Sequence, residues 1–187
     1  MKALLGWLAA SWLATCGVTA QAADASCRHL AGDYDYTGRP ASGSAGYAFG
    51  REPNIAMILF PDNELANDTR VDHYRITFGQ GHIYVELRGR AGLLWRLNLA
   101  NTEDFSYCQD GVLVVERQRQ NLAGSVQGYS RYRHTLRQDA RGDLLVQTDI
   151  SGKYRTWLFA WERPPEHQEA RFVRRPAQPF AASSLSR

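Results

Sequence analysis

The most regular feature of the chain is an alternation of apolar and polar residues with a period of two. In residues 93–99 (LLWRLNL) every second side chain is large and apolar, and the same pattern recurs at residues 73–78 and 82–88. Successive side chains of a strand point to opposite faces, so this spacing predicts half-buried strands. Gly79-Gln80-Gly81 separates the last two segments. Because glycine readily adopts positive φ, these two strands are predicted to form a hairpin.

Shorter stretches of the same kind predict the remaining strands, and turn residues separate most of them. They lie at residues 30–36, 55–60, 112–117, 129–137, 144–150 and 154–161. No long amphipathic helix is apparent in the sequence, and residues 63–71 could form at most a brief helical turn. The strands must therefore bury one face without a helical layer. We predict an all-β fold, an antiparallel meander of about eight or nine strands curled into a small barrel or half-barrel.

The alternation stops at Pro164, where the composition changes. Prolines at 164, 165, 176 and 179, with Ser and Ala near the end, predict a flexible tail over residues 164–187. The β domain then spans residues 23–163, roughly 140 residues, which is a usual size for one domain with one apolar core.

The first 22 residues have the three parts of a secretory signal peptide. Lys2 supplies the positive charge, residues 3–14 form the apolar run, and Ala20-Gln21-Ala22 is a small-x-small cleavage site. This run is too short to span a bilayer comfortably, and no later apolar stretch of about 20 residues follows, so no transmembrane helix is predicted. We expect residues 1–22 to be removed on export, with the periplasm as the destination.

Residues 13–16 (LATC) offer an alternative to that cleavage site. They resemble the lipobox of bacterial lipoproteins, in which cleavage precedes a lipid-modified Cys, although Thr15 departs from the smaller residue usual there. On this alternative Cys16 carries acyl chains and holds the domain at a membrane surface.

Both cleavage sites leave Cys27 and Cys108 in the exported part of the chain. Two cysteines in an oxidising compartment most simply pair with each other, so we predict a disulfide that closes a loop of about 80 residues. Two free buried thiols or a metal pair are the alternatives. Zinc is disfavoured because neither a nearby His-x-x-His nor a second Cys pair accompanies them.

Composition and charge narrow the classes of function. Hydrophobic residues make up 44% of the chain and charged residues 22%, which is ordinary globular usage and argues against disorder of the whole chain. The formal net charge of +3 is too small to imply binding of nucleic acid. No nucleic-acid partner is therefore predicted.

No catalytic motif or cofactor signature is apparent. The five histidines do not converge, no Gly-x-Ser-x-Gly elbow is present, and no glycine cluster opens a helix as a phosphate-binding loop would. We predict no metal site and no cofactor. Asp33 and Asp35 are the remaining enzymatic candidates, because they share one face of the first strand and could bind a cation or flank a glycosidic bond. Alternatively, they are solvent-facing residues beside the buried Tyr34 and Tyr36.

Gly32-Asp33-Tyr34 resembles the Gly-x-Trp motif in the first strand of lipocalins, with tyrosine in place of tryptophan. Lipocalins are ligand-binding up-and-down barrels. The resemblance covers three residues and implies a lipocalin-like architecture at most, with an apolar mouth or cavity.

A strip of charged and aromatic residues is the candidate binding surface. Arg131, Tyr132, Arg133 and His134 follow one another on one predicted strand and would offer cations and rings to a partner. Protection of an exposed strand edge is the alternative.

Together these features predict an exported, non-enzymatic β domain that binds either a small apolar ligand or another component of the cell envelope. A lipoprotein anchored at Cys16, acting as an assembly or inhibitor module, is one alternative. A hydrolase that uses the carboxylates of Asp33 and Asp35 is the other.

Overall fold

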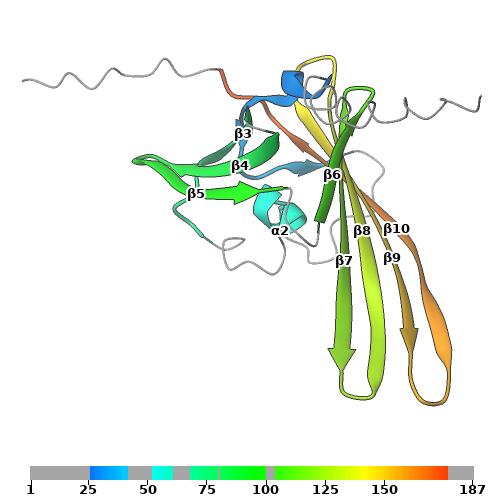
Figure 1. Ribbon diagram of the computed structural model, residues 1–187. Helices are drawn as coiled ribbons and strands as arrows, with labels where there is room; N and C mark the ends of the chain where they lie inside the picture. Colours follow the sequence, from blue (N-terminus) through cyan, green and yellow to red (C-terminus); the bar gives the residue numbers. More distant parts are fainter. Residues whose placement is uncertain (1–25, 42–51, 61–67, 80, 100–103, 177–187) are drawn as a thin grey trace, which may run out of the picture.

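The structure, a computed structural model, describes residues 26–41, 52–60, 68–79, 81–99 and 104–176. These residues form two antiparallel sheets (Figure 1). The four-stranded sheet has the order β1-β3-β4-β5, and its strands are β1 (Gly32–Asp35), β3 (His73–Gly79), β4 (His82–Gly89) and β5 (Gly92–Asn98). The six-stranded sheet has the order β2-β10-β9-β8-β7-β6. Its strands are β2 (Arg39–Pro40), β6 (Asp104–Gln109), β7 (Val112–Ala123), β8 (Val126–Gln138), β9 (Leu144–Arg155) and β10 (Ala160–Phe172).

The predicted all-β class is confirmed, but the described strands do not close into a barrel. β5 ends the four-stranded sheet and β6 ends the six-stranded one, so these neighbours in sequence are not neighbours in a common sheet. β1 and β2, which also follow one another, belong to different sheets. A backbone bridge between Tyr34 and Arg174 joins the edge of the four-stranded sheet to the segment after β10. The two sheets thus enclose the core although the described strands form no closed ring.

Aromatic side chains connect the two sheets. Tyr34 of β1 stacks on Tyr74 of β3 with ring centroids 5.5 Å apart, and Phe172 of β10 meets Tyr74 edge to face at 5.6 Å. All three are fully buried. Leucines and valines of the six-stranded sheet complete this core, including Leu113, Val115, Leu136, Leu144 and Val146.

The predicted disulfide is present between Cys27 and Cys108, whose Cα atoms are 5.9 Å apart. Cys27 precedes the short 3-10 turn η1 (Arg28–Leu30), and Cys108 lies on β6. The bond ties the first described residues to the edge of the six-stranded sheet.

The predicted hairpin is confirmed, whereas the predicted strand at residues 55–60 is wrong. β3 and β4 pair from His73↔Arg88 to Gly79↔His82. Residues 55–59 instead form the helix α2 (Ile55–Leu59), which begins where the side chain of Asn54 accepts a hydrogen bond of 2.7 Å from the Met57 amide. A short apolar run has no clear period, so a cap of this kind decides between helix and strand.

The four strands β7 to β10 are each 12 or 13 residues long and extend well beyond the four-stranded sheet, towards the bottom of Figure 1. We call residues 118–131 and 151–163 the distal arm. The sequence predicted strands at residues 112–117 and 144–150, yet β7 and β9 run on without interruption to Ala123 and Arg155. Polar side chains on both faces remove the apolar alternation there, while the backbone ladder with neighbouring strands continues.

The prediction of a tail from residue 164 is wrong for residues 164–176. β10 pairs with β9 as far as Phe172 and with β2 at Ala170 and Arg171. Pro164 and Pro165 lie where the register with β9 shifts, between Arg163 and Glu166. A proline lacks the N–H that a ladder needs, and a bulge tolerates this loss. Residues 177–187 lie outside the described part of the chain.

Residues 1–25 also lie outside it, so the signal peptide and the lipidation of Cys16 stay predictions. Most of the segment 63–71, for which a brief turn was predicted, also lies outside the described ranges. Its described residues, 68–71, form a turn in which the Val71 amide donates to the Asp68 carbonyl over 3.2 Å. No helix within the described ranges is long and apolar enough to cross a membrane.

Candidate functional site

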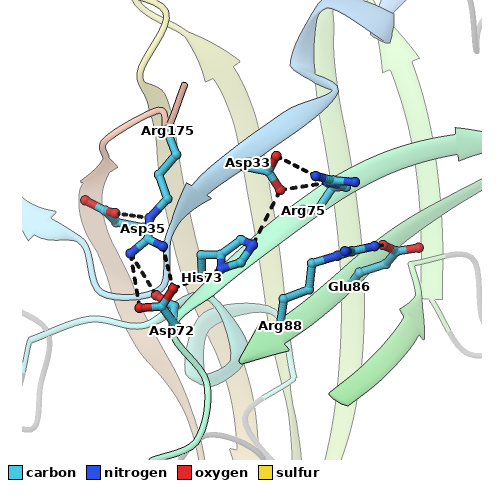
Figure 2. A network of polar contacts seen from close by, with 8 residues as sticks. All are labelled: Asp33, Asp35, Asp72, His73, Arg75, Glu86, Arg88 and Arg175. Carbon is cyan, nitrogen blue, oxygen red and sulfur yellow. Dashed lines mark hydrogen bonds and ion pairs between the residues drawn. The ribbon is translucent and has the colours of Figure 1, made fainter. Parts of the chain in front are cut away.

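Asp33 and Asp35 lie in a network of charged side chains on one face of the four-stranded sheet (Figure 2). As predicted, they share a face of β1 while Tyr34 points into the core. β1 pairs with β3 so that Asp33 lies opposite Arg75. Nε and Nη2 of Arg75 donate to the two carboxylate oxygens of Asp33, both over 2.7 Å.

Arg175, three residues beyond β10, supplies the second half of this network. It donates from Nε to Asp35 over 2.6 Å and from Nη1 to Asp72 over 2.6 Å (Figure 2). The backbone holds the same segment, since the Asp35 amide donates to the Val173 carbonyl and the Arg175 amide to the Asp33 carbonyl. These contacts fasten the end of the six-stranded sheet to the edge of the four-stranded one.

On β4, Nη2 of Arg88 donates to Glu86 over 2.7 Å. His73 lies between the aspartates, 3.7 Å from Asp33 and 3.2 Å from Asp72. Each of the four carboxylates in Figure 2 thus has an arginine partner. Within the described ranges no group of three or more His, Cys, Asp or Glu is arranged to hold a metal ion.

The protonation of Asp33 follows from its surroundings. Burial acts to raise the pKa of Asp33, but the hydrogen bonds and charge of Arg75, with smaller contributions from His73 and Arg88, outweigh it and lower the pKa. The hydrogen bonds of Arg175 likewise lower the pKa of Asp72. A general acid in glycoside hydrolysis needs a raised pKa, so this geometry favours a structural network over acid catalysis.

This network predicts a dependence of stability on pH. Because the pKa of Asp33 is lower in the folded than in the unfolded chain, its ionised form stabilises the fold above the ordinary carboxyl pKa of about 3.9. That contribution is lost as the pH falls through the folded-state value. Asp33→Asn should lower the free energy of unfolding by roughly 1–3 kcal/mol at neutral pH, since Arg75 loses its charged acceptor.

Urea unfolding of the wild type and of Asp33→Asn between pH 7 and about pH 2 measures this. The two curves should converge as the pH falls below about 4. A constant difference between them would show that the charge of Asp33 contributes nothing.

The candidate strip of Arg131, Tyr132, Arg133 and His134 is divided between two faces of β8. Arg131 and Arg133 are exposed, and Arg133 lies 3.6 Å from Glu116. His134 is buried, and its Nδ1 lies 3.0 Å from the Thr148 hydroxyl.

Burial, reinforced by the charges of Arg117 and Arg119, lowers the pKa of His134 to about 3. Tyr132 lies on the same face and stacks on His134 with centroids 6.3 Å apart. The four residues therefore do not form one surface, as their alternate positions on a strand require.

The end of the β9–β10 hairpin exposes three consecutive apolar side chains, which we call the tip. Trp157, Leu158 and Phe159 have 84%, 66% and 61% of their surface exposed. Thr156 closes the turn, since its amide donates to the Phe159 carbonyl over 2.8 Å and its hydroxyl accepts from the amides of Leu158 and Phe159.

Aromatic residues support the tip from behind. Trp161 stacks on Tyr154 with centroids 5.6 Å apart, and the ring of Phe159 lies 5.5 Å from that of Trp161. Tyr154 lies close against the sheet because two of its neighbours are glycines: a Cβ on Gly128 or Gly152 would come within 2.8 Å of the Tyr154 ring. Its hydroxyl also lies 2.7 Å from that of Ser130.

The chain matches no family model, no curated protein and no solved structure in the comparisons made.

Sequence reasoning treated residues 154–161 as an ordinary strand and missed the tip. A signal was present: Trp157, Leu158 and Phe159 are consecutive, so they break the alternation of a half-buried strand. Two-residue hairpin turns usually carry glycine, asparagine or aspartate, whereas this one carries Trp157 and Leu158. The neighbouring β7–β8 hairpin has the ordinary chemistry, with Gly124 at φ +59°.

A groove of about 450 Å³ runs along one face of the distal arm, next to the tip. Its lining includes Leu122, Tyr129, Lys153, Arg155 and Ala160. The distal arm thus combines apolar and cationic side chains on a part of the molecule that projects away from the core.

Proposed function

We propose that the chain is an exported, non-enzymatic binding domain of the cell envelope and that the distal arm is its binding element. The observation that carries this proposal is the tip, where three large apolar side chains are exposed at the end of a long double hairpin. The remainder of the described chain serves as the scaffold that holds the arm.

The composition of the tip supports a role in binding. A contiguous exposed apolar group lowers solubility and commonly marks an interaction site. Neither the turn nor the core needs these side chains, because Thr156 closes the turn and the buried aromatics lie at the other end of the sheet.

Other features support export and a non-enzymatic role. The leader pattern of residues 1–22 and the pairing of Cys27 with Cys108 both suit an oxidising compartment. Anchoring through Cys16 would place the same domain at a membrane. Asp33 and Asp35, the carboxylates considered for hydrolysis, are both neutralised by arginines.

Of the two partner classes predicted from the sequence, an envelope component is favoured over a small apolar ligand. An interior ligand site needs space between the sheets, and this region is filled by the rings of Tyr34, Tyr74 and Phe172. Three consecutive exposed apolar side chains, Trp157, Leu158 and Phe159, lie instead at the end of the arm.

The proposal predicts that binding to isolated envelopes of the source cells depends on the tip. The variant W157S/L158S/F159S should reduce the amount of chain that cosediments with envelopes by at least about tenfold, since each buried apolar side chain contributes about 1.5–3 kcal/mol. Phe105→Ser is the matched control, because Phe105 is 73% exposed but lies on β6, beside Glu116 of β7.

The control should cosediment like the wild type, and both variants should retain the wild-type thermal unfolding midpoint within a few degrees. Equal sedimentation of the wild type and the triple variant would contradict the proposal.

A further inference from the structure

We propose that the tip inserts into the surface of a bilayer that contains anionic phospholipids. This inference rests on the proposed function, since it names the component that the distal arm binds. Three independent features of the arm carry it: the chemistry and shape of the tip, the distribution of charge behind it, and the rigidity of the turn.

The tip has the dimensions and chemistry of an interfacial anchor. Tryptophan favours the boundary between headgroups and acyl chains, where its ring is buried and its N–H stays hydrated. Interfacial elements enter this boundary by about 5–10 Å. At about 3.3 Å per residue, Trp157, Leu158 and Phe159 fit within that depth, with Arg155 at the level of the headgroups and Lys153 above it.

The distal arm is basic although the chain as a whole is nearly balanced. Its cationic residues outnumber its acidic ones by five to one: Arg119, Arg131, Lys153, Arg155 and Arg163 against Glu162. Lys153 pairs with Glu162 over 2.7 Å, and Arg163 pairs with Glu166 just outside the arm. Arg131 and Arg155 are exposed. A positive excess behind an apolar end complements the negative potential of an anionic lipid surface.

The shape of the tip favours a bilayer over a protein as its partner. A stable protein interface buries about 800 Å² on each side, with anchors that fill pockets of the partner. The tip offers three adjacent side chains on a protruding turn, and the strands behind it carry the charged Lys153, Arg155 and Glu162 beside the stacked rings of Tyr154 and Trp161. A fluid lipid surface accepts such a protrusion without a preformed pocket.

The turn is also ordered in advance of binding. The hydroxyl of Thr156 holds two amides of the turn, and the stack of Trp161 on Tyr154 supports Phe159. The three apolar side chains therefore need little ordering when they enter a membrane, which preserves affinity.

Flotation of the full chain with lipid vesicles tests the inference. One set of vesicles is phosphatidylcholine alone, and the other contains about one-third phosphatidylglycerol. The wild type should float at least about tenfold more with the anionic vesicles, and added salt should weaken this binding. W157S/L158S/F159S should lower the binding by at least about tenfold, and Phe105→Ser should leave it unchanged.

Hydrogen exchange on the vesicle-bound wild type locates the contact, so that binding by any other segment is recognised. Peptides that cover residues 155–163 should gain protection, and those that cover residues 104–110 should not. Wild-type flotation that the triple variant retains, without protection of residues 155–163, would overturn the inference.

The two experiments distinguish a failure of the lipid assignment from a failure of the proposed function. If vesicles bind neither protein while envelopes still retain the wild type and release the triple variant, the arm binds a protein of the envelope and the lipid assignment is wrong. If envelopes also fail to discriminate between them, both proposals are wrong.

Discussion

Replacing Phe172 by alanine should lower the free energy of unfolding by about 3–5 kcal/mol. Phe172 is fully buried, meets the ring of Tyr74 edge to face, and lies so close to the backbone of Gly38 that a Cβ there would come within 2.9 Å of its ring. Alanine would remove the side chain that joins β10 to the four-stranded sheet and would leave a cavity between the sheets. Urea unfolding followed by circular dichroism measures the loss.

Val173→Ala is the control for this prediction. Val173 is the next residue and is 45% exposed, so its truncation should change the free energy of unfolding by no more than about 0.5 kcal/mol. If residues 164–187 were a flexible tail, the two variants would behave alike. A difference of several kcal/mol between them therefore tests the position of β10 directly.

Breaking the bond between Cys27 and Cys108 should lower the free energy of unfolding by about 2–5 kcal/mol. The two residues are 81 positions apart, so the bond removes much of the conformational freedom of the unfolded chain. It also ties the segment before η1 to β6, an edge strand with only one neighbour in its sheet. Urea unfolding with and without reductant gives the value.

The double variant Cys27→Ala/Cys108→Ala supplies the reference for the disulfide. Its stability should be close to that of the reduced wild type, and reductant should not change it. No effect of reductant on the wild type would show that the bond does not stabilise the fold.

Apolar alternation predicted the strands of the core and failed where the strands leave it. β3 and β4 were found because one face of each is buried and the other is not. β5 was found by the same alternation, although Leu93 and Trp95 on its predicted buried face are 51% and 43% exposed. Beyond Arg117 the part of β7 in the distal arm has no buried apolar layer, so the alternation ends there even though β7 and β8 pair in register to Ala123↔Val126.

The prediction of a tail from residue 164 was wrong for residues 164–176 because it read two prolines as the end of a strand. Pro164 and Pro165 indicate a break in a strand, and a register shift does occur there, but β10 resumes at Glu166 and continues to Phe172. A sequence pattern shows that a ladder bond is lost at a proline. It does not show whether the chain ends its strand or passes through a bulge, because this depends on the strands at either side.

The candidate sites were predictable to different degrees. Strand periodicity placed Asp33 and Asp35 on one face correctly, but their partners Arg75 and Arg175 lie 42 and 140 residues away along the chain and could not be inferred. The same periodicity, applied to β8, would have separated His134 from Arg133. The tip was visible as a run of consecutive apolar residues, but only the hairpin shows that it lies in a turn.

The position of β10 has a consequence for folding during synthesis. The core is completed by Phe172, while Tyr34 and Tyr74 are made much earlier, and β2 has no described strand partner other than β10. A nascent chain that has emerged only as far as β9 therefore leaves aromatic surface uncovered and sheet edges open, which favours aggregation. Stable folding of the described core therefore has to wait for nearly the whole polypeptide, because Phe172 is among the last described residues.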